Sequence, residues 1–334
     1  MSGLRVLFIG GTGIISSACS RLAVERGIDL FVLNRSRSAD RPLPSGATAL
    51  RGDIRDPVSV RDALGDRHFD VVVDWVAFTE EHVRADIELF RGRTAQYVFI
   101  SSASAYQTPP ARLPVTESTP LRNPFWAYSR DKIACENLLT AAYRDEGFPA
   151  VIIRPSHTYD KTLVPFDGGW TVLGRMRQGK PIVVHGDGTS SWTLTHHVDF
   201  ARGFVPLLGH QRTIGEAFHI TSDDVLTWDQ VARTLAAAAG VTAEIVHVPS
   251  DAIAAADPDW GAGLLGDKAH SMVFDNSKLR RVVPDYRAVI PFEQGAREIV
   301  AWHDEDPSRQ QTDPRIDRAM DQLIDTYRLR PQPL

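Results

Sequence analysis

The segment Leu4-Arg5-Val6-Leu7-Phe8-Ile9-Gly10-Gly11-Thr12-Gly13-Ile14-Ile15-Ser16 decides the fold, because an apolar run ends there in glycines and a helix follows. Glycine permits a tight turn and lets the backbone approach a pyrophosphate, which then lies at the helix N-terminus. Gly10 and Gly13 have the spacing of such a turn, and Ser16 replaces a third glycine with a small residue. The segment therefore predicts a dinucleotide-binding turn, with a plain glycine turn as the alternative.

Strand-like and helix-like segments alternate from this turn to about Arg154. Strands that read as continuous apolar runs are typical of a parallel sheet covered on both faces. We expect strands at Leu4–Ile9, Leu30–Leu33, Ala47–Leu50, Val71–Val73, Tyr97–Ile100 and Val151–Ile153. We expect helices at Ser16–Arg26, Pro57–Leu64, Glu80–Phe90 and Trp126–Tyr143. The pattern predicts an α/β fold with a doubly wound parallel sheet.

The pattern changes after Pro155, where glycine, proline and tryptophan become frequent. We expect residues 1–155 to form a dinucleotide-binding domain to which some later segments return. Residues 156–334 should form a smaller C-terminal α/β region that binds the substrate. Helices are expected there at Thr227–Ala239, Glu293–Trp302 and Ile316–Tyr327.

Composition excludes several classes of protein. The chain has 334 residues, 43% of them hydrophobic, so it can bury a sizeable core. Its apolar runs are too short to span a membrane, and two cysteines cannot support a disulfide scaffold. A net charge of −5 argues against a nucleic-acid partner. The N-terminus lacks a signal-peptide layout, so we expect a cytoplasmic enzyme. His196, His197 and Asp199 could suggest a metal site, but the sequence offers no evident further ligand, so no metal is expected.

The end of the second strand usually selects the cofactor, because a carboxylate there binds the ribose 2′-OH and repels a 2′-phosphate. Asn34 and Arg35 occupy this position, with Arg37 and Arg41 nearby. These arginines could pair with a 2′-phosphate or could be solvated loop residues, so the residues alone lean slightly to NADP. Asp53 should touch the adenine from the next strand end.

Tyr128 and Lys132 stand four residues apart and so share one helix face. Hydride chemistry at an alcohol carbon needs a base near neutral pH, so the pKa of a tyrosine must fall from about 10 to about 7. A neighbouring ammonium and a positive nicotinamide ring act in that direction. Ser101 and Ser102, at the preceding strand end, could hold the substrate oxygen. An ordinary surface contact is the alternative for the Tyr–Lys pair alone.

The sequence resembles the extended short-chain dehydrogenase/reductase family, in its sugar-nucleotide epimerase/dehydratase branch. The similarity covers roughly Leu4 to Thr221 and rests on the glycine turn, residues 52–56, 99–106 and 128–132, Arg154-Pro155 and residues 185–189. It implies a Rossmann-type sheet, Tyr128 as catalytic base and acid, Lys132 on the nicotinamide ribose, and Ser102 orienting the reacting oxygen.

The resemblance also implies the binding residues for NAD, with NADP possible. Those expected to bind the cofactor are Gly10, Thr12, Gly13, Ile14, Ile15, Asn34, Arg35, Asp53, Ile54, Trp75, Val76, Ala77, Ser101, Tyr128, Lys132, Pro155 and His157. Those expected to bind a sugar-containing substrate are Ser102, Ala103, Ser104, Tyr128, His157, Trp170 and Trp192.

Departures from the family pattern narrow the chemistry. Ala103 and Ser104 replace an Asp–Glu pair, so a 4,6-dehydratase is not expected. Trp192 stands where an arginine usually clamps the nucleotide diphosphate, and His157 replaces an asparagine. A nucleoside or another glycoside without a diphosphate is therefore a credible substrate, although Arg280 and Arg281 could supply phosphate contacts.

The leading hypothesis is an NAD(P)-dependent epimerase of a nucleotide sugar, nucleoside or related glycoside that works through a transient ketone. One alternative is an NADP-dependent reductase or dehydrogenase with net redox turnover. Non-catalytic RNA-binding and regulatory relatives are further alternatives. A homodimer is possible, and its apolar candidates could equally be core residues: Val83, Ile87, Phe90 and Leu139.

Overall fold

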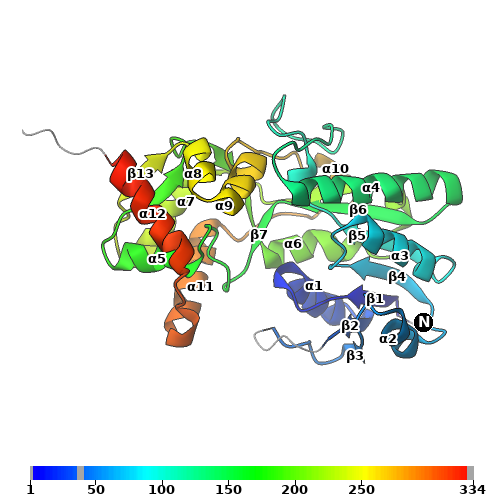
Figure 1. Cartoon of the computed structure of the whole chain (residues 1–334). Helices are drawn as coiled ribbons and strands as arrows, with labels where there is room; N and C mark the ends of the chain where they lie inside the picture. The colour runs from blue at the N-terminus through cyan, green and yellow to red at the C-terminus, as the bar shows by residue number, and fades with distance from the viewer. Residues whose placement is uncertain (1–2, 36–40, 329–334) are drawn as a thin grey trace, which may run out of the picture.

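A seven-stranded parallel sheet is the centre of the computed structural model, which describes residues 3–35 and 41–328 (Figure 1). Its strand order is β11-β6-β5-β4-β1-β2-β3, so the winding reverses between β1 and β4. The predicted Rossmann-type doubly wound sheet is thus confirmed. The strands are β1 (Arg5–Ile9), β2 (Asp29–Asn34), β3 (Thr48–Arg51), β4 (Phe69–Asp74), β5 (Thr94–Ile100), β6 (Ala150–Pro155) and β11 (Ala217–Ile220).

Helices cover both faces of this sheet because alternate strand residues point to opposite sides. Val6 and Phe8 pack in the core that contains α1 (Ile14–Glu25) and α6 (His197–Phe204). Leu7 and Ile9 pack in the opposite core. That second core contains α2 (Pro57–Leu64), α3 (Glu80–Phe90) and α4 (Ala127–Glu146). Each fully buried Val, Leu, Ile or Phe stabilises the fold by about 1.5–3 kcal/mol.

The apolar residues suggested for a dimer contact belong to the core between α3, α4 and the sheet. Val83 and Leu139 are fully buried, and Ile87 and Phe90 are nearly so. Because these side chains are already buried within one chain, they are not available to a partner chain.

The C-terminal region is built from short strand pairs and helices around a third core. The pairs are β7 (His157–Tyr159) with β10 (Leu194–His196), β8 (Ile182–His185) with β13 (Ile245–Val248), and β9 (Ser191–Trp192) with β12 (Leu226–Thr227). The helices are α5 (Trp170–Arg177), α7 (Trp228–Ala238), α8 (Ser250–Ala256), α9 (Pro258–Gly263), α10 (Ser277–Val282), α11 (Phe292–Asp304) and α12 (Pro314–Tyr327). A π-helical turn, Leu264–Lys268, follows α9 directly.

The chain passes between the two regions more than once. After β7 to β10, α6 packs against α1, and β11 pairs with β6 in the large sheet. α10 then lies beside β11. Within the described residues, the helices lack the combined length and apolarity that a membrane crossing needs.

Candidate active site

The glycine turn lies at the point where the sheet reverses its winding. Gly10 has a φ of +84°, and its amide donates to the Leu33 carbonyl at 2.9 Å. A Cβ on Gly10 would lie 3.0 Å from Val76 Cγ1, and one on Gly11 would lie 2.8 Å from Val32 Cγ1. The turn can therefore approach a ligand with bare backbone, at the N-terminus of α1.

A cavity of about 700 Å³ opens over this turn. Its size and its glycine cradle at a helix N-terminus fit a dinucleotide. It is lined by these residues predicted to bind the cofactor: Gly10, Thr12, Gly13, Ile14, Ile15, Asn34, Arg35, Asp53, Ile54, Trp75 and Val76.

The arginines beside this crevice already face carboxylates. Arg35 lies 3.9 Å from Asp53. Arg41 Nε donates to Asp160 at 2.7 Å, and Arg41 also donates to Thr162. Arg37 lies outside the described residues. A 2′-phosphate would have to compete with these pairs.

Lys132 is buried and points between two strand ends. Its Nζ donates to the Ala77 carbonyl at 2.7 Å and to the Ile100 carbonyl at 2.8 Å. It lies 5.8 Å from the centre of the Tyr128 ring. Burial lowers the pKa of Lys132 to about 8. Ala77 thus anchors the lysine through its carbonyl and does not line the crevice.

Tyr128 and Ser102 face a second cavity. Burial raises the pKa of Tyr128 to about 12; a hydrogen bond with Ser102 lowers it, and the charge of Asp267 raises it. The Lys132 ammonium is directed to two backbone carbonyls and is not among the groups that shift the pKa of Tyr128 in this structure, so the acidification expected from Lys132 and a nicotinamide ring stays a prediction. At neutral pH the phenol therefore carries its proton.

This second cavity has a volume of about 310 Å³ and lies beyond the end of β5. Sequence reasoning placed seven of its residues in the site: Ser102, Ala103, Ser104, Tyr128, Pro155, His157 and Trp192. It missed the other four: Trp126, Ser156, Asp267 and Lys268. Trp126 could have been found from its place two residues before Tyr128, whereas Asp267 and Lys268 carry no local signal.

Two predicted residues lie elsewhere. The Ser101 hydroxyl donates to Glu136 at 2.5 Å, inside the molecule and away from the crevice. Trp170 stacks on His303 at 4.9 Å between ring centres and is not part of the cavity wall. Both side chains are held by α4 or α11, elements whose partners cannot be read from local sequence.

His157 and Trp192 line the cavity, and each carries a buried ring nitrogen. His157 Nε2 and Trp192 Nε1 lack hydrogen-bond partners among the described residues. Burial lowers the pKa of His157 to about 3, so this ring is neutral. Both nitrogens could therefore bond a ligand group.

The other polar candidates are held by structural contacts. Arg280 donates to Asp223 at 2.5 Å and does not line the substrate cavity. His196 bonds Glu298 at 3.1 Å, and His197 donates to the Ile14 carbonyl at 3.2 Å. In the described part of the chain, no three histidine, cysteine or acidic side chains gather as metal ligands.

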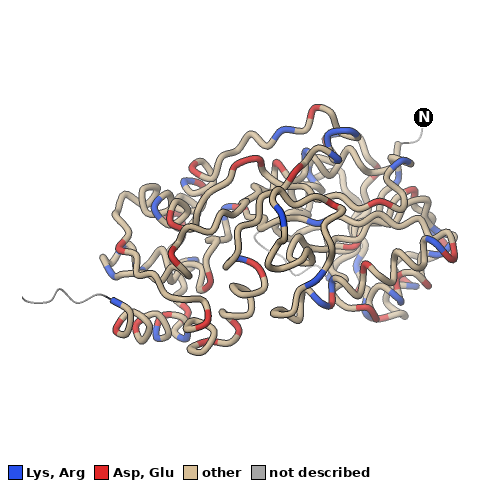
Figure 2. Tube along the Cα trace, turned by 90° about the horizontal axis from the view of Figure 1, so that it is seen from above, with Lys and Arg blue, Asp and Glu red and all other residues tan. Residues whose placement is uncertain are grey.

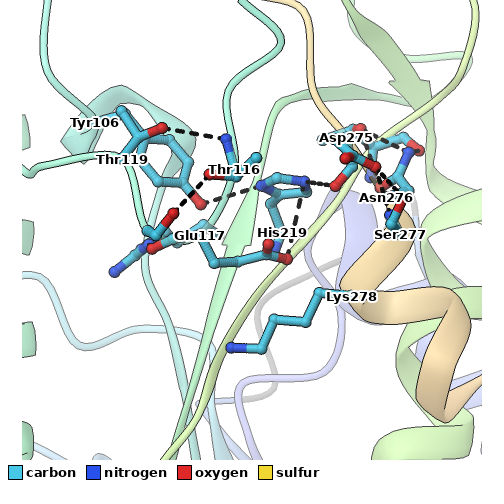
Figure 3. Close-up of polar contacts among 12 residues, drawn as sticks. Tyr106, Thr116, Glu117, Thr119, His219, Asp275, Asn276, Ser277 and Lys278 are labelled. Atoms are coloured by element: carbon cyan, nitrogen blue, oxygen red, sulfur yellow. Dashed lines mark hydrogen bonds and ion pairs between the residues drawn. The ribbon is translucent and has the colours of Figure 1, made fainter. Parts of the chain in front are cut away.

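A buried polar network supports the strands behind the site. Figure 3 shows His219 between Tyr106 and Asp275. His219 Nε2 donates to the Asp275 carbonyl at 2.8 Å, so Nδ1 accepts from the Tyr106 hydroxyl at 3.0 Å. Burial, as the largest effect, lowers the pKa of His219. The neighbouring pair Arg154–Glu136 joins β6 to α4.

Comparison with known proteins places this geometry in a family. Residues 6–221 match the model of the "NAD dependent epimerase/dehydratase family". The chain is 28% identical over 297 residues to 2′-dehydrokanamycin reductase of Streptomyces kanamyceticus, covering 85% of this chain and 80% of that protein. It is 28% identical over 256 residues to the chloroplast stem-loop binding protein of 41 kDa b of Arabidopsis thaliana, covering 73% of this chain and 65% of that protein.

A solved structure supports the fold. UDP-glucuronic acid 4-epimerase from Bacillus cereus in complex with NAD superposes with a TM-score of 0.72 at 18% identity, covering 92% of this chain and all of that one. The matched residues run from β1 through β11, the whole of the large sheet, and include the glycine turn and the Tyr128–Lys132 helix. This chain is therefore a member of the NAD-dependent epimerase/dehydratase family.

Proposed function

We propose that this enzyme transfers hydride between NAD and a carbinol carbon of a glycoside, with Tyr128 moving the hydroxyl proton. The observation that carries the proposal is the placement of Tyr128 and Ser102 on one cavity and of the glycine turn on its neighbour. Bound NADH supplies the hydride that reduces a ketone. Ser102 would hold the ketone oxygen, and Tyr128 would donate its proton to that oxygen.

Net reduction of a keto-glycoside is the first candidate for the overall reaction. A phenol with a pKa of about 12 is a proton donor at neutral pH. The relative that covers 85% of this chain is named a reductase. Epimerisation through a transient ketone is the second candidate, favoured by the family to which the chain belongs. It uses the same proton transfer in both directions.

The walls of the cavity favour a substrate without a nucleoside diphosphate. In the described part of the chain, no arginine lines it. Lys268 is its lining cation and has a carboxylate 3.9 Å away. Trp192 occupies the wall with an apolar ring. Rings of this kind stack on sugar faces and cannot neutralise a diphosphate.

NAD is the cofactor of the family, and the residues around the adenosine end of the crevice favour it over NADP. Arg35 and Arg41 each face a carboxylate, Asp53 and Asp160. Rearranging them around a 2′-phosphate would leave Asp160, which is almost fully buried, without its partner.

The test is turnover of Tyr128→Phe against matched Tyr143→Phe, since Tyr143 lies on the same helix and is 40% exposed. Tyr128→Phe should lose about 10²–10⁴-fold in turnover and still bind NAD. Tyr143→Phe should match the wild type. The assay follows NADH absorbance with a panel of keto-glycosides and sugar nucleotides. Wild-type turnover by Tyr128→Phe would refute the proposed proton donor.

Cofactor stoichiometry separates the two net reactions. A reductase consumes one NADH per product, whereas an epimerase converts a sugar with catalytic NAD and no net change in NADH.

An RNA-binding role, suggested by the plant relative, predicts salt-dependent affinity for a stem-loop and no redox turnover. Figure 2 shows basic and acidic residues interspersed along the trace, and the net charge of −5 argues against that role.

A further inference from the structure

The π-helical turn Leu264–Lys268 forms one wall of the substrate cavity and presents two charged side chains to it. Asp267 and Lys268 both line the cavity that holds Tyr128. π-helical turns are rare and occur often at functional sites. This turn comes from more than 130 residues beyond Tyr128 in sequence.

The backbone of the turn is fixed from several sides. Asn123 Nδ2 donates to the Gly266 carbonyl at 2.6 Å and to the Ser104 carbonyl at 2.9 Å, so it ties the turn to the segment after Ser102. His185 Nε2 donates to the Lys268 carbonyl at 2.9 Å. A Cβ on Gly266 would lie 2.6 Å from Trp126 Cβ, so only glycine permits this approach. The two charged side chains therefore start from a rigid base.

The charged ends, in contrast, have unused hydrogen-bonding capacity. The side chains of Asp267 and Lys268 are 14% and 11% exposed, and their charged atoms lie 3.9 Å apart, too far for a direct hydrogen bond. Within the described residues, neither the Asp267 carboxylate nor the Lys268 ammonium makes a hydrogen bond. Mostly buried charges are costly unless they find such partners.

We propose that Asp267 and Lys268 form a subsite for adjacent hydroxyl groups of a neutral glycoside, with the carboxylate accepting from one hydroxyl and the ammonium donating to its neighbour. Trp126 and Trp192 would flank the sugar ring. The subsite rests on the proposed function for the class of substrate, a glycoside, and for the location of the reacting carbon. An ammonium substituent suits this subsite less well, because it would gain from Asp267 and be repelled by Lys268.

The ionisation of Asp267 should make ligand binding at the subsite depend on pH. Burial raises the pKa of Asp267 to about 6, while Lys268 lowers it and Asp167 raises it. Besides Lys268, the cavity wall carries two further titratable groups, Tyr128, with a pKa of about 12, and His157, with a pKa of about 3. Neither changes charge between pH 5 and 8. Affinity for a hydroxyl donor should therefore fall as pH decreases through about 6.

Binding is measured by tryptophan fluorescence with methyl α-D-glucopyranoside, methyl α-D-galactopyranoside and methyl α-D-mannopyranoside, and with the 2-amino-2-deoxy form of the first. The variants are Asp267→Asn and Lys268→Met. Their matched controls are Asp259→Asn and Lys180→Met, at exposed positions. Each test variant should weaken binding of the preferred neutral glycoside about tenfold, because a hydrogen bond to a charged group is lost. Both controls should bind as the wild type does.

Asp267→Asn should also lose the pH dependence, and its Tm at neutral pH should not fall, because the variant removes a desolvated charge. A misfolded variant is thereby distinguished from a lost contact. Wild-type protein that binds none of the three neutral glycosides overturns the subsite, as does tenfold preference for the amino form. The redox proposal is judged separately, by the NADH turnover of Tyr128→Phe, whereas the subsite is judged by glycoside binding of Asp267→Asn and Lys268→Met in the absence of turnover.

Discussion

Gly10 holds a backbone conformation that L side chains rarely adopt, at the place where the sheet meets the cofactor crevice. Its φ of +84° and its closeness to Val76 are two separate requirements for glycine. Gly27 shares the first requirement, with a φ of +76°, but has open space where a Cβ would stand. A substitution at Gly27 therefore tests backbone strain alone, whereas one at Gly10 tests backbone strain together with crowding beside the cofactor crevice.

Gly10→Ala and Gly27→Ala should both lower the free energy of unfolding by about 1–2 kcal/mol through the left-handed backbone. Only Gly10→Ala should also lose NAD binding, because its methyl group would press on Val76 and narrow the crevice. The measurement is Tm with and without NAD at about 100 times its wild-type Kd, where bound ligand stabilises by about 2.7 kcal/mol. An undiminished NAD shift in Gly10→Ala would contradict the assigned cradle.

Residue spacing predicted Tyr128, Lys132 and Ser102 because they follow one another on a single strand–helix unit. Spacing could not predict the direction of the Lys132 ammonium, because its acceptors are backbone carbonyls: Ile100 ends β5, and Ala77 lies in the loop after β4, a separate segment of the sheet. Asp267 and Lys268 were out of reach for the same reason. Their place in the cavity depends on how a distant π-helical turn packs against Trp126.

α4 carries Tyr128, and a buried ion pair fixes its middle to the sheet. Arg154 on β6 bonds both oxygens of Glu136, with Nη2 to Oε2 at 2.5 Å, and Ser101 donates to the same carboxylate. Both charged side chains are more than nine-tenths buried. An exposed pair, Arg91–Glu146, joins the end of the same helix to α3's C-terminus. The two ion pairs both involve α4 and differ in burial, so their contributions to stability can be compared directly.

Glu136→Gln should cost about 3–5 kcal/mol of unfolding free energy, because Arg154 keeps a buried charge without its counter-ion. Glu146→Gln should change stability by less than about 1 kcal/mol, as exposed pairs do. Urea unfolding followed by circular dichroism measures both. Equal effects of the two substitutions would show that burial does not decide the strength of these contacts.

Long apolar runs made the central strands predictable, since a parallel strand buried on both faces leaves little choice of residue. The helix at Glu80–Phe90 was located at its observed bounds, because three apolar residues, Val83, Ile87 and Phe90, recur at helical spacing. The C-terminal strands β7 to β10 have two to four residues each, which is too short for a periodic signal. Their pairing depends on contacts between segments far apart in sequence.

At the scale of the whole molecule, Arg41 ties the segment before β3 to the segment after β7. It donates to Asp160 and Thr162, and Asp160 is 3% exposed. Burial raises the pKa of Asp160, but hydrogen bonds from Arg41 and Thr162 outweigh it and hold the pKa below its ordinary value. The tie therefore stabilises the fold when Asp160 is ionised in both the folded and unfolded chain.

Arg41→Met should lower stability at pH 7 by about 1–3 kcal/mol, because the Asp160 carboxylate loses its main partner in a buried place. The pKa of Asp160 is depressed in the folded state, so the wild-type advantage is present above about pH 4 and disappears as pH falls through the folded pKa. Urea unfolding of both proteins between pH 7 and pH 3 measures the difference, with exposed Arg212→Met as the matched control. A difference that persists undiminished at pH 3 would mean that Arg41 acts through packing, and that the charge of Asp160 does not hold the two segments together.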